Sequence, residues 1–103
     1  MNWTARRRRF RQILAGNDCV TPATVFNPLS ARMVEELGGQ VGMLAGSVAA
    51  MSILGAPDKM LITASEFADM ALRICRAGDL AVIADADHGY GNAMNVQRTI
   101  REL

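Results

Sequence analysis

The sequence predicts an α/β fold, because a first helical segment is followed three times by a short apolar run and another helical pattern. That order is typical of parallel strands joined by right-handed crossovers. Three parallel strands need cover on both faces and leave both edges unpaired. We therefore expect the N-terminal portion of a (β/α)8 barrel, a fold that usually takes about 250 residues. The expected partial barrel domain covers 1–103, with an N-terminal helix at 1–18 and the first three βα units at 19–103.

The composition suits one intracellular domain. Half of the residues are apolar and the net charge is +1, which argues against a dedicated nucleic-acid binder. No apolar run reaches the ~18 residues of a membrane span, and the N-terminus lacks the apolar core of a signal peptide. Cys19 and Cys75 have no metal-ligand spacing, so we expect buried, reduced thiols. These features predict a cytoplasmic protein without membrane or nucleic-acid partners.

The first helix is predicted from its amphipathic pattern. Thr4 is the expected cap, and Phe10, Ile13 and Leu14 form an apolar stripe. The arginines at 6–9 then fall mostly on the solvent side. An arginine run is also compatible with an anionic partner, but within an amphipathic helix it is more often a solvated face.

The first βα unit has a clear boundary between strand and helix. β-branched residues between 19 and 26, interrupted by Pro22, predict a strand that begins after this proline. Asn27 and Pro28 then predict a helix start, and the glycines at 38–39 predict its end. The expected buried side of this helix consists of Leu29, Met33 and Leu37.

The second apolar run, at 41–45, ends in Gly46 and Ser47, and a segment at 48–54 can then be helical. A glycine lets backbone N–H groups approach an anion closely, and a helix start adds partial positive charge. The same residues are also compatible with a plain tight turn that has a serine cap. The residues alone leave both interpretations open.

The third unit begins with a loop at 55–59, in which Asp58 is either a turn former or a site acid; the residue pattern favours the turn. A capping box at 63–66 then opens a helix that Gly78 closes. Its expected buried stripe is Phe67, Met70, Ala71, Ile74 and Cys75. The last helix is marked by Val96, Ile100 and Leu103.

The third strand, at 80–84, stops abruptly in Asp85 and Asp87, which a glycine-rich turn follows. Because strand side chains alternate between faces, these two acids are expected to point the same way and to share a ligand. Paired carboxylates suit Mg²⁺ or Mn²⁺ better than zinc. Alternatively the acids cap the turn, although an acid at the end of a buried strand is costly unless it is paired or bound to metal.

His88, the only histidine, follows the acids. It is compatible with a general acid or base, a third metal ligand, or a turn residue that hydrogen-bonds a carboxylate. The glycines at 89 and 91 do not form a dinucleotide fingerprint, because Met94 occupies the third glycine position and the preceding acids would repel a pyrophosphate.

Four ordered segments resemble the isocitrate lyase and phosphoenolpyruvate mutase superfamily, and within it most the oxaloacetate decarboxylase branch, where a histidine follows the acid pair. They are 26–32 (FNPLSAR), 45–49 (AGSVA), 55–58 (GAPD) and 85–93 (DADHGYGNA). The resemblance runs from about residue 10 to the end of the chain. It implies a (β/α)8 barrel in a homo-oligomer that exchanges a helix between subunits, and Mg²⁺-dependent action on small 2-oxo or 2-hydroxy acids.

The resemblance also implies roles for individual residues. Asp85 matches the direct metal ligand, and Asp87 and Asp58 match acids that hold metal-bound water. Asp58 and His88 are the candidate catalytic side chains. The candidate substrate-binding positions are Gly46, Ser47 and Val48. The arginine and histidine contacts that the family supplies from later strands have no counterpart in these 103 residues.

The implied reaction is decarboxylation of oxaloacetate to pyruvate and CO₂, through an enolate that Mg²⁺, or Mn²⁺ in its place, and the Ser47 region can stabilise. No nucleophile is required. The same enolate would arise from cleavage of a methylisocitrate-like substrate. The alternatives are therefore a methylisocitrate lyase-like or phosphonomutase-like enzyme of the superfamily, or a non-catalytic truncated fragment.

Overall fold

A computed structural model describes residues 3–103 and confirms the α/β class. Three parallel strands form one sheet in the order β1 (Ala23–Thr24), β2 (Val41–Leu44) and β3 (Ala81–Ala84). β2 lies in the centre, and all four of its residues pair with β3. The third strand therefore lies beside the second, as the chain order predicts.

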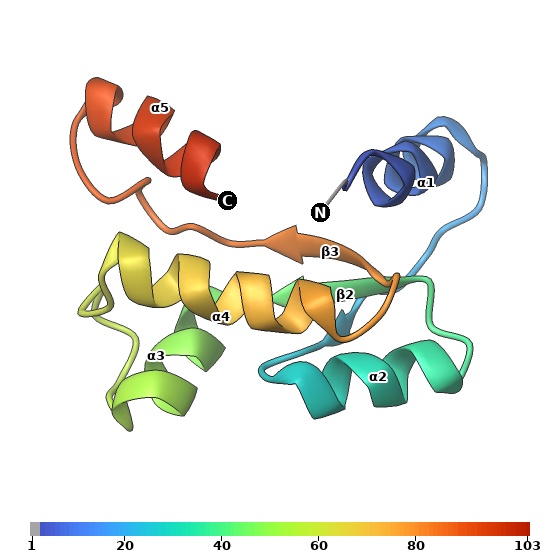
Figure 1. Cartoon of the computed structure of the whole chain (residues 1–103), viewed down its shortest axis with the longest axis horizontal. Helices are drawn as coiled ribbons and strands as arrows, with labels where there is room; N and C mark the ends of the chain where they lie inside the picture. The colour runs from blue at the N-terminus through green and yellow to red at the C-terminus, as the bar shows by residue number, and fades with distance from the viewer. Residues whose placement is uncertain (1–2) are drawn as a thin grey trace.

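Five helices surround this sheet in the described residues: α1 (Thr4–Ala15), α2 (Pro28–Glu36), α3 (Gly46–Leu54), α4 (Ala64–Arg76) and α5 (Ala93–Glu102). In Figure 1, α2, α3 and α4 lie on one side of the sheet, whereas α1 and α5 lie on the other. Both α3 and α4 separate β2 from β3, so this crossover contains two helices. Among residues 3–103, no helix is long and apolar enough to cross a membrane.

The core lies between the sheet and α4. Phe67 and Ile74 of α4 are buried, as the predicted stripe requires, together with Leu44 of β2. Gly42 in β2 permits this packing, because a Cβ there would lie 2.9 Å from Cδ2 of Leu80. Each large apolar side chain buried in this way stabilises the fold by about 1.5–3 kcal/mol.

The predicted side-chain caps at Asn27 and Thr63 are confirmed. The hydroxyl of Thr63 accepts a hydrogen bond from the Glu66 amide at 3.2 Å, and the Glu66 carboxylate accepts one from the Thr63 amide at 2.8 Å. The amide and the hydroxyl of Thr63, which both donate to this carboxylate, lower the pKa of Glu66. The side chain of Asn27 accepts in the same way from the Ser30 amide at 2.7 Å. Each reciprocal pair satisfies amides that a helix start leaves without partners.

The predicted buried side of α2 is wrong. Leu29, Met33 and Leu37 are 66%, 53% and 85% exposed, whereas Ala31 is buried and Val34 packs against the core. α2 carries two neighbouring apolar lines, and the line with the smaller residues faces the core, while α2 also contacts α4. A flat small-residue line lets the helix approach the core closely, so the larger side chains stay outside.

The last helix is confirmed as α5, but the apolar residues that marked it are only partly buried. Val96 is half-buried, but Ile100 is 70% exposed and Leu103 is 38% exposed. Thr99 is buried instead, and its hydroxyl donates a hydrogen bond to the Gly89 carbonyl at 2.8 Å. A polar contact with the preceding loop therefore orients this helix.

The first helix differs from its prediction in several ways. Its N-cap position is Trp3, and Thr4 is already the first helical residue. No residue of α1 is buried, and Leu14 of the predicted stripe is 68% exposed. Cys19 is exposed and Cys75 is half-buried, both as free thiols, so burial is wrong for Cys19.

Two arginines that were expected on the solvent side hold the turn between α4 and β3. Arg6 donates through Nη2 to the carbonyls of Cys75 (2.6 Å) and Gly78, and Arg9 donates to the Asp79 carbonyl at 2.9 Å. Cations at a helix C-terminus satisfy its last carbonyls and interact favourably with its dipole. The arginine run is thus divided between contacts with the fold and solvent.

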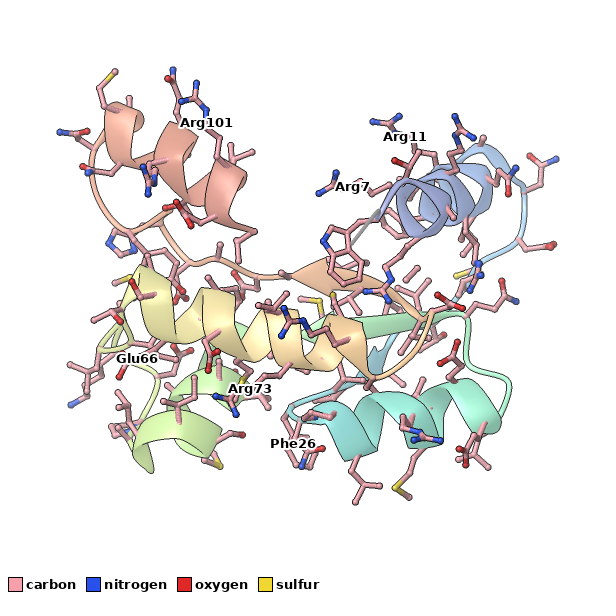
Figure 2. All side chains as sticks on the ribbon, viewed as in Figure 1. Arg7, Arg11, Phe26, Glu66, Arg73 and Arg101 are labelled. Carbon is pink, nitrogen blue, oxygen red and sulfur yellow. The ribbon has the colours of Figure 1, made fainter. Side chains whose placement is uncertain are left out.

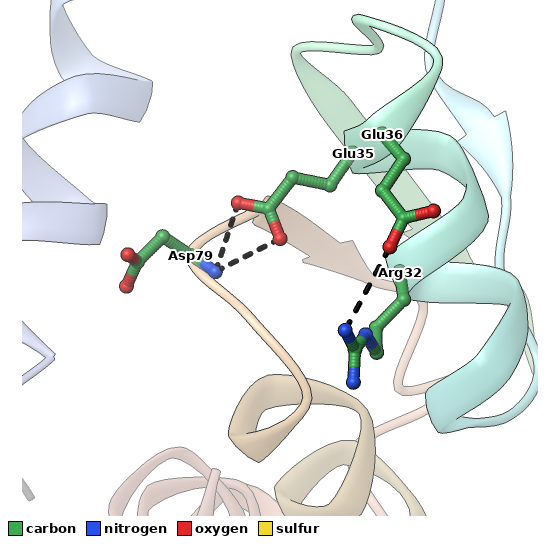
Figure 3. A network of polar contacts seen from close by, with 4 residues as sticks. All are labelled: Arg32, Glu35, Glu36 and Asp79. Atoms are coloured by element: carbon green, nitrogen blue, oxygen red, sulfur yellow. Dashed lines mark hydrogen bonds and ion pairs between the residues drawn. The ribbon is translucent and has the colours of Figure 1, made fainter.

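The same turn is held from the other side by α2. Both carboxylate oxygens of Glu35 accept from the Asp79 amide, at 3.0 and 3.2 Å (Figure 3). Gly78 makes room for this carboxylate, because a Cβ at that position would lie 2.0 Å from Oε2 of Glu35. The segment that leads into β3 therefore has partners on both sides.

Candidate active site

The carboxyl ends of β2 and β3 bring the predicted site residues to one edge of the sheet. The Asp85 amide donates to the Leu44 carbonyl at 2.9 Å, which continues the pairing one residue beyond β3. On the β2 side, α3 begins at Gly46. A Cβ added to Gly46 would lie 2.7 Å from Oδ1 of Asp87, so this glycine is in close contact with the acid. Two segments about forty residues apart thus meet at this edge.

The two acids lie close together for a different reason from the one predicted. β3 ends at Ala84, so the alternation of strand side chains does not extend to Asp87. Asp87 has φ 47°, in the left-handed region, and its amide donates to Oδ1 of Asp85 at 3.1 Å. A local turn therefore links the two acids. Asp85 accepts a hydrogen bond within this turn, which agrees with the alternative that the acids cap the turn.

The loop acids repel one another. The pKa of Asp87 is raised, first by desolvation and then by the negative charges of Asp85 and Asp58, while His88 lowers it. Asp58 of the α3–α4 loop thus lies within electrostatic range of Asp87. The negative charges around Asp87 form a region where a cation would be stabilised.

The carboxylates at this edge suit a divalent cation that keeps several water molecules in its coordination shell. Within residues 3–103, no three His, Cys, Asp or Glu side chains are arranged to hold a metal ion together. That finding gives no support to His88 as a third ligand. Mg²⁺ is typically bound through one or two carboxylates, with water and substrate completing its shell. Asp85 and Asp87 fit that pattern, and their charge repulsion gives the cation a role.

The start of α3 offers a site for an anion beside these acids. Gly46, Ser47 and Val48 occupy its first turn, where backbone N–H groups have no partner within the helix. The N-cap residue is Ala45, whose side chain gives no capping hydrogen bond. The alternative of a turn with a serine cap is therefore wrong, because Ser47 lies inside the helix. Free amides and the helix dipole favour a carboxylate or an oxyanion here.

The residue pattern missed Tyr90, which packs beneath the acids. Its ring centroid lies 5.8 Å from that of His88 and 6.0 Å from that of Phe67. Its hydroxyl is buried and has no hydrogen-bond partner among the described residues. Desolvation, then the charges of Asp87 and Asp85, raise the pKa of Tyr90 to about 12. The phenol therefore stays protonated, as a donor beside the carboxylates.

Several residues of this loop have a strained backbone conformation, and in the sequence only the glycines of the loop indicated it. Tyr90 has φ 64° and Asp87 has φ 47°, while Gly89 and Gly91 also have positive φ. A residue with a side chain in this region costs of order 1–3 kcal/mol, and such residues cluster at functional sites. Asp58, Asp85, Asp87 and His88 are all exposed, so these residues leave the site open to solvent.

Comparisons with known proteins agree with this geometry. Residues 10–103 match the family described as phosphoenolpyruvate phosphomutase. The chain is 62% identical over 97 residues to oxaloacetate decarboxylase 1 of Pseudomonas fluorescens (strain Pf0-1), covering 94% of this chain and 34% of that protein. It is 53% identical over 103 residues to an oxaloacetate decarboxylase of Rhodopseudomonas palustris (strain BisB18), covering all of this chain and 36% of that protein.

Solved structures show the same arrangement. Oxaloacetate acetylhydrolase superposes with a TM-score of 0.85 at 30% identity, over 92% of this chain and 34% of that one. A 2,3-dimethylmalate lyase of the PEP mutase/isocitrate lyase superfamily superposes with a TM-score of 0.81 at 29% identity, over 97% of this chain and 34% of that one. The chain thus spans about a third of the length of these proteins. Because the match covers nearly all of its residues, the chain belongs to the phosphoenolpyruvate phosphomutase family.

Proposed function

We propose that these residues supply part of the active site of an oxaloacetate decarboxylase, a lyase that converts oxaloacetate to pyruvate and CO₂ with Mg²⁺, or Mn²⁺ in its place. One observation carries the proposal: Asp87, whose amide donates to Asp85, lies against Gly46 at the uncapped N-terminus of α3. A cation site and an anion site are thus adjacent, as a chelating 2-oxo acid requires. The names of the similar decarboxylases support this choice of substrate.

Asp85 and Asp87 are the residues that would hold the cation, Asp85 directly and Asp87 through water, with Asp58 orienting further water. When bound, the cation would supply positive charge close to the C1 carboxylate and C2 oxygen of the substrate. A bound cation would favour the charged form of Asp87, whose pKa is raised by desolvation and then by the neighbouring negative charges.

The first turn of α3 would bind the substrate. The amides of Gly46 and Val48, with the amide and hydroxyl of Ser47, are the donors available for its carboxylate and for the negative charge on its C2 oxygen. Loss of CO₂ from C4 leaves the electrons of the C3–C4 bond in an enolate, and proton delivery to C3 gives pyruvate. His88 is exposed and lies beside Asp87, which suits it to delivering that proton.

A methylisocitrate lyase-like or phosphonomutase-like reaction is the alternative, since a lyase and a phosphomutase share this fold. All three reactions would use the same cation-binding acids and the same first turn of α3, so the residues described here do not distinguish between them. A homo-oligomeric assembly and a cytoplasmic location stay predictions.

The proposal is tested in a chimera in which these 103 residues replace the matching third of the Pseudomonas fluorescens decarboxylase. We expect pyruvate formation from oxaloacetate that depends on Mg²⁺ and stops with a chelator. Oxaloacetate with Mg²⁺ and no protein is the blank. A folded chimera that releases no pyruvate, or that acts equally well with chelator, would refute the proposal. Activity on a 2-methylisocitrate or phosphonopyruvate substrate alone would favour the alternative.

A further inference from the structure

The hydroxyl of Tyr90 is a buried polar group to which the fold gives no partner. Among residues 3–103, buried side-chain nitrogen or oxygen atoms without a hydrogen bond occur only in Arg6 and Tyr90. Arg6 still donates to two carbonyls through Nη2, whereas the phenol makes no hydrogen bond within the described chain. A phenylalanine would fill the same space without an unsatisfied polar group, so the hydroxyl calls for an explanation.

The position of the Tyr90 ring does not depend on its hydroxyl. The ring packs against the core, and its centroid lies 6.0 Å from that of Phe67. The backbone of Tyr90 has φ 64°, a left-handed conformation that side chains rarely adopt. The Thr99 hydroxyl binds the preceding Gly89 carbonyl and so holds the loop on α5. Backbone and ring contacts therefore place the hydroxyl, and its proton is free for another acceptor.

Two carboxylates lie within electrostatic range of this hydroxyl. Desolvation and then the negative charges of Asp87 and Asp85 raise the pKa of Tyr90 to about 12, so the phenol stays protonated. Glu66, at the start of α4 on the same side of the molecule as the β3–α5 loop (Figure 2), is already bound to Thr63. The Asp87 carboxylate, by contrast, accepts no hydrogen bond from the described residues. A donor and an acceptor without partners thus lie near each other.

We propose that Tyr90 is a positioning residue for the cation site: when a divalent cation is bound by Asp85 and Asp87, the Tyr90 hydroxyl donates a hydrogen bond to the Asp87 carboxylate and fixes its orientation. The inference rests on the proposed function, which assigns these acids to the cation. Asp85 and Asp58 repel the Asp87 carboxylate, and a bound cation offsets this repulsion. Partners that orient metal-binding side chains typically contribute roughly 10–100-fold to metal affinity.

The test compares Tyr90→Phe, which removes only the hydroxyl, with the unchanged decarboxylase chimera. Mn²⁺ alone is the probe, and the electron paramagnetic resonance signal of the free ion gives the affinity. We expect Tyr90→Phe to bind Mn²⁺ at least about tenfold more weakly. Without cation, its thermal midpoint should equal or exceed that of the unchanged chimera, because the lost hydroxyl has no partner among the described residues. An unchanged affinity, or a lower midpoint without cation, would overturn the proposal.

A double-mutant cycle shows whether the hydroxyl acts through Asp87. In an Asp87→Ala background the acceptor is gone, so Tyr90→Phe should change the Mn²⁺ affinity by less than about twofold. Asp58→Ala is the matched control, because it removes another site acid and keeps the acceptor. The loss of about tenfold should persist in that background. A similar loss in both backgrounds would contradict the proposal, as would a loss in neither.

The unchanged chimera separates this inference from the proposed function. If it binds no Mn²⁺, the acids do not form a cation site, and both the inference and the proposed function fail. If it binds Mn²⁺ with the same affinity as Tyr90→Phe, the inference alone fails and the proposed function stands.

Discussion

The two ends of β3 differ in whether their polar groups have partners. At its amino end, backbone groups of the α4–β3 turn are held by side chains from two other helices, with Arg6 and Arg9 donating and Glu35 accepting. At its carboxyl end, Asp85 and Asp87 repel each other, and Tyr90 keeps a buried hydroxyl without a partner among the described residues.

The difference agrees with our proposal, in which the amino end of β3 serves stability and the carboxyl end carries the active-site acids. Satisfied hydrogen bonds at the amino end define where β3 starts, and so where its other end delivers the acids. Unsatisfied groups and left-handed residues at the carboxyl end lower stability and are retained where a ligand can compensate for them. In α/β barrels the carboxyl face of the strands is where catalysis is found, and the opposite face serves stability.

The largest effect should come from removing an acid at the carboxyl end. In the decarboxylase chimera, Asp85→Ala is expected to lower Mg²⁺-dependent pyruvate formation at least about 100-fold, because it removes the proposed direct ligand. Asp79→Ala is the matched control at the amino end: it keeps the backbone amide that Glu35 binds, so activity should persist. Comparable rates in the two variants would end the assignment of Asp85.

Removing the acceptor at the amino end should affect stability. Glu35→Ala leaves the Asp79 amide without its carboxylate partner, and we expect the free energy of unfolding to fall by about 1–2 kcal/mol. Urea unfolding of the chain, followed by circular dichroism, measures the change. An unchanged midpoint would mean that the turn is held by the arginines of α1 alone.

Relieving repulsion at the carboxyl end should stabilise the chain. The folded state raises the pKa of Asp87 above its ordinary value of 3.8, so it binds the proton more tightly than the unfolded state does. The stabilising contribution of this group is complete below that ordinary value and is lost as pH rises through the folded pKa. Asp87→Asn should therefore be the more stable protein at pH 7, by about half a kcal/mol or less because solvent screens so exposed a charge.

The pH dependence of this stabilisation shows whether it comes from removing the charge of Asp87. The advantage of Asp87→Asn should shrink as the pH is lowered below the ordinary value of 3.8, because the wild-type carboxyl then binds its proton. Thermal unfolding at several pH values follows it, with Asp79→Asn as the control for loss of one carboxylate. A gain that is the same at every pH would point to the backbone preference of asparagine for the left-handed region.

The smallest change in stability is expected from replacing Glu36, the residue after Glu35. Glu36 lies 3.7 Å from Arg32 in an ion pair whose side chains are 70% and 63% exposed (Figure 3). Exposed pairs at this spacing contribute about 0.3–0.5 kcal/mol at most. Glu36→Ala should thus shift the urea midpoint much less than Glu35→Ala. A shift of equal size would show that helix content, and not the contact with the turn, accounts for both.

Local chemistry could be predicted from the sequence. The caps at Asn27 and Thr63 join groups three residues apart, so a short segment contains all the atoms involved. The same holds for the strand that ends in Asp85, and for the four segments that identified the family. The start of α3 at Gly46, by contrast, lies two residues before the helical segment that was expected at 48–54.

Only the tertiary structure decided the choices that depend on distant partners. Arg6 meets a carbonyl 69 residues away, and nothing near it in sequence distinguishes it from the solvated arginines beside it. The choice between the two apolar lines of α2 depended on the shape of the core against which this helix packs. Gly46 and Asp87 meet because β2 and β3 are neighbours in the sheet. Sequence patterns describe which side chains can be buried or bonded, whereas packing determines which of them are.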